Sequence, residues 1–145
     1  MLTEKDYCDY DTCVALREVG CRIQTQWYIH QPSYERGFCY LCFGIPRETS
    51  VLDECDYIPR LSLYEAQKWL RDEKQMLVIP LIFADNLIDE DGKIVDRWKY
   101  YSFAIYSTST AEFIRNYDQG EECDSYEEAL LEGVKSAIKI LKEEK

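Results

Sequence analysis

Two cysteines three residues apart are the first feature of the chain that suggests chemistry. Cys39 and Cys42 form a Cys-x-x-Cys pair, the spacing used by zinc sites and by dithiol enzymes. Residues 38–43 are apolar and lack the Gly or Pro that turns a zinc knuckle, and residues three apart on a strand face opposite sides. A second pair of ligands is missing, because only Cys55 and His30 are nearby. We therefore expect buried free thiols here, and no metal or cofactor.

Two further pairs have the residue types of nucleophilic catalysis. His30 is the only histidine, so a Cys–His pair would have to use it with any of the seven cysteines. It stands before a Gln-Pro break, which favours a solvated strand end. Ser136 and Lys139 have the Ser-x-x-Lys spacing of some acylating hydrolases, but the companion motifs are absent. The sequence thus assigns no catalytic residue, and a hydrolase or thiol enzyme is the third of our functional alternatives.

An acidic loop at Asp89-Glu90-Asp91-Gly92 has part of the pattern of an EF-hand calcium loop. Aligning Gly92 with the invariant glycine of that loop places Leu87 at the first ligand position. The same alignment places Trp98 at the last position, where a bidentate Glu is required. The match fails where charge matters most, so the segment is predicted to be the solvated tip of a β-hairpin.

The elements that carry these residues follow from hydrophobic periodicity and capping signals. Two segments open with a capping box, Ser62 to Glu65 and Ser125 to Glu128, and each continues as an amphipathic helix. The prediction is one α+β domain over residues 1–145, with about three helices and an antiparallel or mixed sheet of about four strands. The predicted order α-β-β-α-β-β-α has helices at 9–19, 63–74 and 126–143 and strands at 21–30, 37–43, 76–85 and 94–106. The connections 46–60 and 107–124 are predicted to be irregular, and Pro80 to lie on an edge strand or at a bulge.

Three of these patterns resemble one family. They are ALREVGC (Ala15 to Cys21), YEAQKWLRDEK (Tyr64 to Lys74) and SYEEALLEGVKSAIKIL (Ser125 to Leu141). In order and spacing they resemble small uncharacterised phage and prophage proteins of Bacteroides-type gut bacteria. Residue 21 is Cys where the family pattern has a large apolar side chain. The resemblance implies a phage or mobile-element origin, and no functional residue carries over from it.

Charge limits the partners of the chain. The formal net charge is −11 over 145 residues, and the sequence has no run of Lys or Arg, so nucleic-acid backbones and anionic membrane surfaces would be repelled. The acidic N-terminus lacks an apolar signal region, and the odd number of cysteines favours a reducing compartment, so we expect a cytoplasmic protein. The second functional alternative is an acidic mimic of DNA that occupies a host nucleic-acid-binding protein. It requires that the clusters of carboxylates align on one face.

The first functional alternative rests on aromatic residues. The chain has twelve Tyr and three Trp, which are typical anchors of protein interfaces. In the strand predicted at 94–106, alternation places Trp98, Tyr100 and Tyr106 on one side, with Phe103 and Ile105 on the other. The second side is predicted to meet the helices. We therefore predict that at least two of the three aromatic residues are partly exposed, in a non-enzymatic protein that binds another protein or itself.

Overall fold

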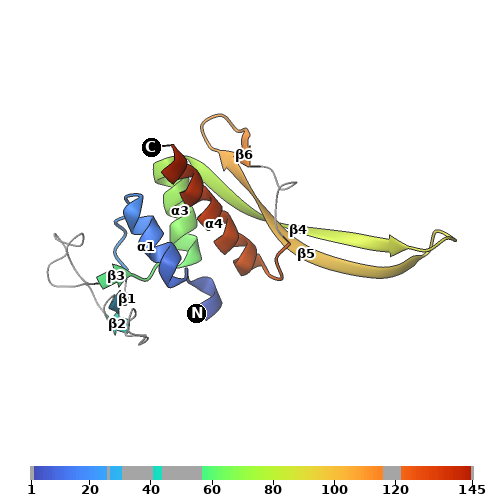
Figure 1. Ribbon diagram of the computed structural model, residues 1–145, viewed down its shortest axis with the longest axis horizontal. Helices are drawn as coiled ribbons and strands as arrows, with labels where there is room; N and C mark the ends of the chain where they lie inside the picture. Colours follow the sequence, from blue (N-terminus) through green and yellow to red (C-terminus); the bar gives the residue numbers. More distant parts are fainter. Residues whose placement is uncertain (1, 26, 31–40, 44–56, 116–121, 145) are drawn as a thin grey trace. The chain divides into compact units, whose positions relative to one another are not determined.

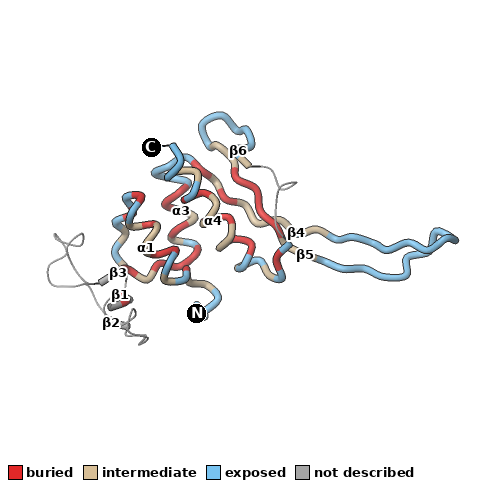
Figure 2. Tube along the Cα trace, viewed as in Figure 1, coloured by how far each residue is buried: buried red, intermediate tan, exposed pale blue. Residues whose placement is uncertain are grey.

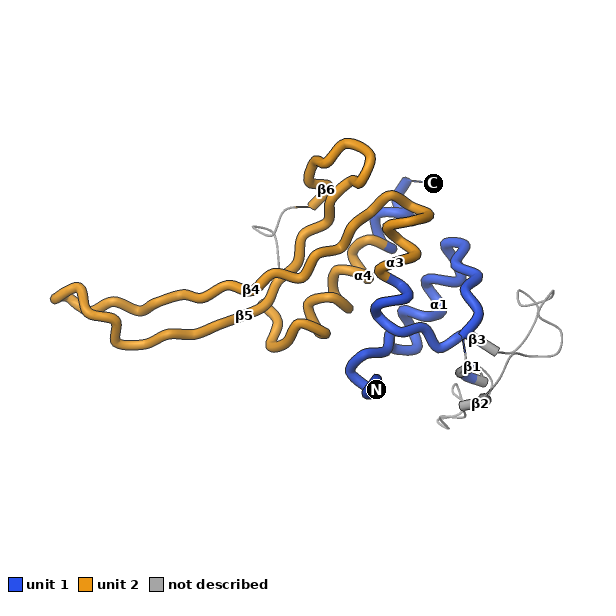
Figure 3. Tube along the Cα trace, turned by 180° about the vertical axis from the view of Figure 1, so that it is seen from behind, with its two compact units in different colours: residues 1–66, 138–145 blue, residues 67–137 orange. Residues whose placement is uncertain are grey.

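The computed structural model describes residues 2–25, 27–30, 41–43, 57–115 and 122–144, without the side chains of 27, 30, 41–43 and 57. It has the predicted α+β composition, with antiparallel strands. The chain divides into two compact units, residues 1–66 with 138–145 and residues 67–137 (Figure 3). The division falls within helices α3 and α4, and each unit is described by itself.

The first unit contains a 3-10 turn, a helix and a small sheet. The turn is η1 (Glu4–Asp6) and the helix is α1 (Tyr10–Glu18). Asp9 begins α1 by accepting a hydrogen bond from the backbone N–H of Thr12, 2.9 Å away, and Gly20 ends it with φ of 102°. The sheet has the order β2-β1-β3, built from β1 (Trp27–His30), β2 (Leu41–Phe43) and β3 (Tyr57–Pro59).

The second unit contains a long two-stranded ribbon extended by one short strand (Figure 1). Strand β4 (Met76–Ile88) pairs antiparallel with β5 (Ile94–Ser107), which pairs with β6 (Phe113–Arg115). The predicted hairpin is confirmed: the backbone N–H of Asp89 donates to the carbonyl of Lys93, and Gly92 adopts φ of 79°. Pro80 lies on β4, an edge strand in the order β4-β5-β6, as predicted.

Both capped helices form where the sequence places them. The helix α3 (Leu63–Lys74) has a complete capping box, since the backbone N–H of Glu65 donates to Ser62 Oγ and the backbone N–H of Ser62 donates to Glu65 Oε1. In α4 (Tyr126–Glu143), Ser125 Oγ accepts from the backbone N–H of Glu128. The Glu128 carboxylate accepts instead from the backbone N–H of Asp124, one residue before the predicted position.

The strands differ from the predicted set in three places. Residues 21–25 lie outside β1, and two connections predicted to be irregular contain the short strands β3 and β6. Of the strand predicted at 37–43, only residues 41–43 lie within the described chain. The strands also belong to two sheets, one in each unit. Three-residue strands carry too little periodicity to be recognised in a sequence, because pairing with a longer neighbour stabilises them.

Helical spacing predicts that Val134, Ile138 and Leu141 of α4 are buried and that Lys135, Lys139 and Lys142 are exposed. The structure buries Val134 and Ile138 and exposes Lys139 and Lys142, whereas Leu141 and Lys135 are each half-buried. Within the second unit, α4 approaches the ribbon most closely at Gly133. A Cβ atom placed on Gly133 would lie 2.3 Å from Val78 Cγ1 and 3.2 Å from Phe103 Cγ. Gly133 therefore lets the helix lie directly on β4 and β5.

Candidate functional site

The β4–β5 ribbon has two faces whose residues follow from the strand register. Val78 lies opposite Ile105, and Pro80 lies opposite Phe103. Val78 and Phe103 lie next to Gly133 of α4, so α4 packs on this face of the ribbon. This agrees with the sequence-based expectation that Phe103 and Ile105 meet the helices. We call this side of the ribbon the reverse face. The residues that alternate with it form the aromatic face, whose large apolar members are Leu77, Ile79, Leu81, Phe83, Leu87, Trp98, Tyr100 and Tyr106.

The aromatic face is a row of side chains that stay partly accessible to solvent. Trp98 is 45% exposed, and Tyr100 and Tyr106 are half-buried, so the exposure predicted for these residues is observed. On β4, Leu77, Ile79, Leu81 and Phe83 are also half-buried. Figure 2 shows burial falling along the ribbon, from its buried base to its exposed tip.

Aromatic contacts organise this row. The rings of Phe83 and Tyr100, directly opposite each other in the register, stack with centroids 5.3 Å apart. Tyr106 meets Phe113 of β6 at 4.3 Å between centroids, and Phe113 is itself 45% exposed. Between these pairs, β5 has the small buried residues Ser102 and Ala104, opposite Leu81 and Ile79 of β4. Since Leu81 and Ile79 are half-buried, they join the two aromatic pairs into one apolar row.

Near the tip of the ribbon, acidic residues lie on the aromatic face and basic residues lie on the reverse face. On the aromatic face, Asp85 lies opposite Trp98 and Asp96 lies opposite Leu87. On the reverse face, the charged residues of this segment are Arg97 and Lys99. All four are exposed. The outer half of the aromatic face thus has acidic groups beside its aromatic rings, and the outer half of the reverse face is basic.

Of the pairs considered for nucleophilic catalysis, the structure describes the surroundings of Ser136. Ser136 Oγ lies 2.5 Å from Arg115 Nη1, and the guanidinium of Arg115 also lies 4.8 Å from the centre of the Phe103 ring. This serine therefore accepts a hydrogen bond from a guanidinium, whereas a catalytic serine gives its proton to a base. His30 lies in β1, with its side chain outside the described residues.

The acidic loop serves the hairpin turn. Asp89 Oδ1 accepts hydrogen bonds from the backbone N–H groups of Asp91, at 3.0 Å, and Lys93, at 2.9 Å. These bonds hold the carboxylate within the turn, as expected for an Asx-type structure. In the described part of the chain, no group of three or more His, Cys, Asp or Glu side chains has an arrangement that suits a metal ion.

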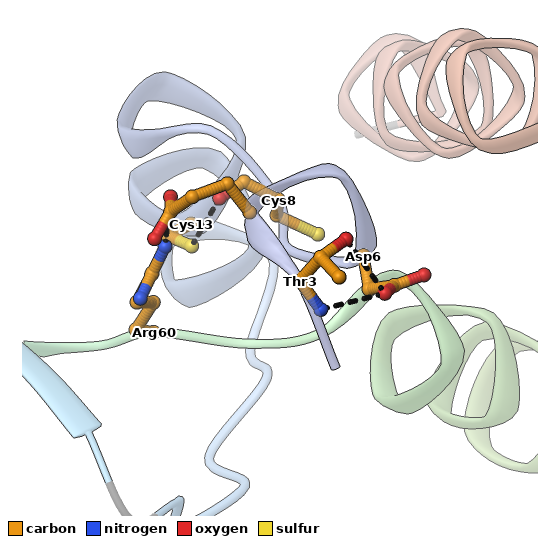
Figure 4. Close-up of polar contacts among 6 residues, drawn as sticks. Thr3, Asp6, Cys8, Cys13 and Arg60 are labelled. Carbon is orange, nitrogen blue, oxygen red and sulfur yellow. Dashed lines mark hydrogen bonds and ion pairs between the residues drawn. The ribbon is translucent and has the colours of Figure 1, made fainter. Parts of the chain in front are cut away.

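The described cysteines are buried thiols. Cys39 and Cys55 lie outside the described residues, as does the side chain of Cys42, so the Cys-x-x-Cys prediction is not tested. In the first unit, Cys13 Sγ lies 3.9 Å from the carbonyl oxygen of Cys8 (Figure 4). Hydrogen bonding with Cys13 and burial raise the pKa of Cys8, while the same hydrogen bond lowers the pKa of Cys13. Burial raises the pKa of Cys21. The raised pKa values of Cys8 and Cys21 oppose thiolate formation, which catalysis by cysteine would need.

The sequence has acidic clusters at 6–11, 53–56, 89–91 and 121–124, and some of their carboxylates serve local structure. Asp9 caps α1, and Asp6 accepts from the backbone N–H of Thr3 and from the hydroxyl of Tyr64. Nearby, Arg60 pairs with Glu4 and lies over the Tyr7 ring. The cluster at 53–56 lies outside the described residues. These bonds give Glu4, Asp6 and Asp9 a structural use, and the DNA-mimic alternative stays a prediction.

Comparison of the chain with protein-family models, with curated proteins and with solved structures finds no match. Among the residues that the structure describes, none of the helices combines the length and apolar character needed to cross a membrane. The functional argument therefore depends on the geometry of the chain itself.

Proposed function

We propose that this chain is a non-catalytic protein-binding domain that holds its partner against the aromatic face of the β4–β5 ribbon. The observation that carries the proposal is the row of partly exposed apolar side chains on that face, from Leu77 at its base to Trp98 near its tip. Scattered exposed apolar residues are common on proteins, but contiguous rows mark interaction surfaces.

Energetics support a docking role for the ribbon. A two-stranded hairpin alone is marginally stable in water, and the outer part of this one is exposed on both strands. Completing the burial of a half-buried large apolar side chain contributes roughly 1 kcal/mol, about half the value for full burial. A partner that covers the six half-buried apolar side chains of the aromatic face would gain several kcal/mol, which is enough to offset part of the entropy lost on association.

The cellular setting is part of the same proposal. Free thiols at the described cysteines suit a reducing compartment, so we infer a cytoplasmic partner. The phage or mobile-element origin is proposed from the resemblance of three helical patterns. Neither inference changes the residues assigned to the interface.

The proposal is tested by photocrosslinking in cells that make the protein. The photoreactive residue benzoylphenylalanine replaces Trp98 on the aromatic face in one variant and Ile82 on the reverse face in a matched variant. Ile82 is 56% exposed and Trp98 is 45% exposed, so random collisions would label Ile82 at least as well. We expect discrete adducts with another protein from position 98 only. Equal labelling at both positions would contradict the proposal, and adducts between two copies would identify self-association.

A further inference from the structure

The charges around Trp98 indicate the chemistry of the partner. Cross-strand pairing places Asp85 directly opposite Trp98, a separation of about 5 Å between Cβ atoms. Asp96 precedes Trp98 by two residues on the same face, about 7 Å along the strand. Trp98, which is 45% exposed, therefore has one acidic neighbour across the strand pair and another along its own strand.

In the part of the chain that the structure describes, these carboxylates have no basic partner. Asp96 Oδ1 accepts only a backbone hydrogen bond, from Arg97. The nearby cations, Arg97 and Lys99, lie on the reverse face. The two carboxylates and the ring are thus available to a ligand that approaches the aromatic face.

We propose that Trp98, Asp85 and Asp96 receive a Lys or Arg side chain of the partner, whose neighbouring apolar residues cover Phe83 and Tyr100. A cation over an indole ring is attracted by the ring quadrupole, and Trp is the best of the aromatic residues for this contact. The carboxylates of Asp85 and Asp96 can form ion pairs with the same cation. This inference rests on the proposed function, because it specifies the chemistry of what binds the aromatic face.

A second copy of the chain fits this surface less well. Two aromatic faces in contact would bring four carboxylates together, two from each copy. An aromatic face against a reverse face would match the charges, but such a head-to-tail contact leaves an open face at each end unless its rotation closes a ring. The net charge of −11 per copy also opposes such growth.

The test uses the full chain and two synthetic peptides of about nine residues in which Leu or Phe alternates with Lys, or with Glu in the matched peptide. Affinity is measured by titration at about 50 mM and about 300 mM salt. We expect the Lys peptide alone to bind the wild type, and to bind more weakly at the higher salt concentration. Trp98→Ala should reduce binding at least about tenfold, and the double variant Asp85→Asn/Asp96→Asn about fivefold.

A control variant separates local from overall charge. Glu73→Gln/Glu143→Gln changes the net charge by the same amount at exposed positions in α3 and α4, and it should bind as the wild type does. Equal losses in both double variants, or equal binding of both peptides, would overturn the basic-side-chain inference. If, in either of these cases, peptide binding were still weakened by Trp98→Ala, the proposed protein-binding function would stand. Peptide binding that Trp98→Ala leaves unchanged would contradict both the basic-side-chain inference and the proposed function. Sedimentation that shows copies of the chain associating through Trp98 would overturn the basic-partner inference in favour of self-association.

Discussion

The close approach of α4 to the ribbon predicts that a single added methyl group at Gly133 destabilises the protein. In Gly133→Ala, the new Cβ would lie 2.3 Å from Val78 Cγ1 and 3.2 Å from Phe103 Cγ. The first distance is far inside van der Waals contact. Val78 cannot easily rotate away, because a β-branched side chain has a restricted χ1 angle and this one is buried.

The expected magnitude is the difference between two opposing effects. Overpacking a buried contact costs about 1–3 kcal/mol, and this distance places Gly133→Ala at the upper end. Replacing Gly by Ala inside a helix stabilises it by about 1 kcal/mol. We therefore expect the free energy of unfolding to fall by about 2 kcal/mol.

Urea unfolding followed by circular dichroism measures this change, and a double-mutant cycle identifies its cause. Val78→Ala alone should lower the free energy of unfolding by about 2 kcal/mol, because the smaller side chain leaves a cavity. In the double variant the added methyl group of residue 133 occupies that space, so the two losses should not add. A gain of about 1 kcal/mol in Gly133→Ala, as helix propensity alone predicts, would refute the packing described here.

Three further predictions concern other parts of the chain. In α4, Ile138→Ala should lower the free energy of unfolding by about 2–5 kcal/mol because Ile138 is buried. Lys139→Ala, at an exposed position, should change it by no more than about 0.5 kcal/mol. Comparable losses for the two variants in urea unfolding would disprove the assigned apolar stripe. The hydrogen bond from the Thr3 backbone lowers the pKa of Asp6, so its contribution to stability is present above the unfolded value near 3.8 and disappears as pH falls through the lower folded value. A carboxyl titration by NMR checks this, and an Asp6→Asn variant that is as stable as the wild type near neutral pH would contradict it. The described thiols should resist a thiol reagent at pH about 8 until urea exposes them. Of the seven cysteines, four are described and buried, so fast reaction of more than three thiols in the native protein would count against burial of Cys8, Cys13, Cys21 and Cys123.

Much of the secondary structure was predictable because its causes are local. Ser62 with Glu65, and Ser125 with Glu128, mark helix starts through hydrogen bonds within a single turn. The hairpin tip follows from Gly92, which adopts the positive φ that an L side chain disfavours. The fold class and the exposure of Trp98 followed from the periods of these elements.

The tertiary structure decided what depends on pairing between distant segments. The sequence did not reveal β3 and β6, since three-residue strands exist through their neighbours, or the division of the strands into two sheets. It placed Trp98 on a face, but the cross-strand register placed Asp85 beside it and Phe83 against Tyr100. A shift of one residue would move every one of these side chains to the other face, because the period of a strand is two. The composition of the candidate surface is therefore a property of register, whereas the helices that support the ribbon are a property of the sequence.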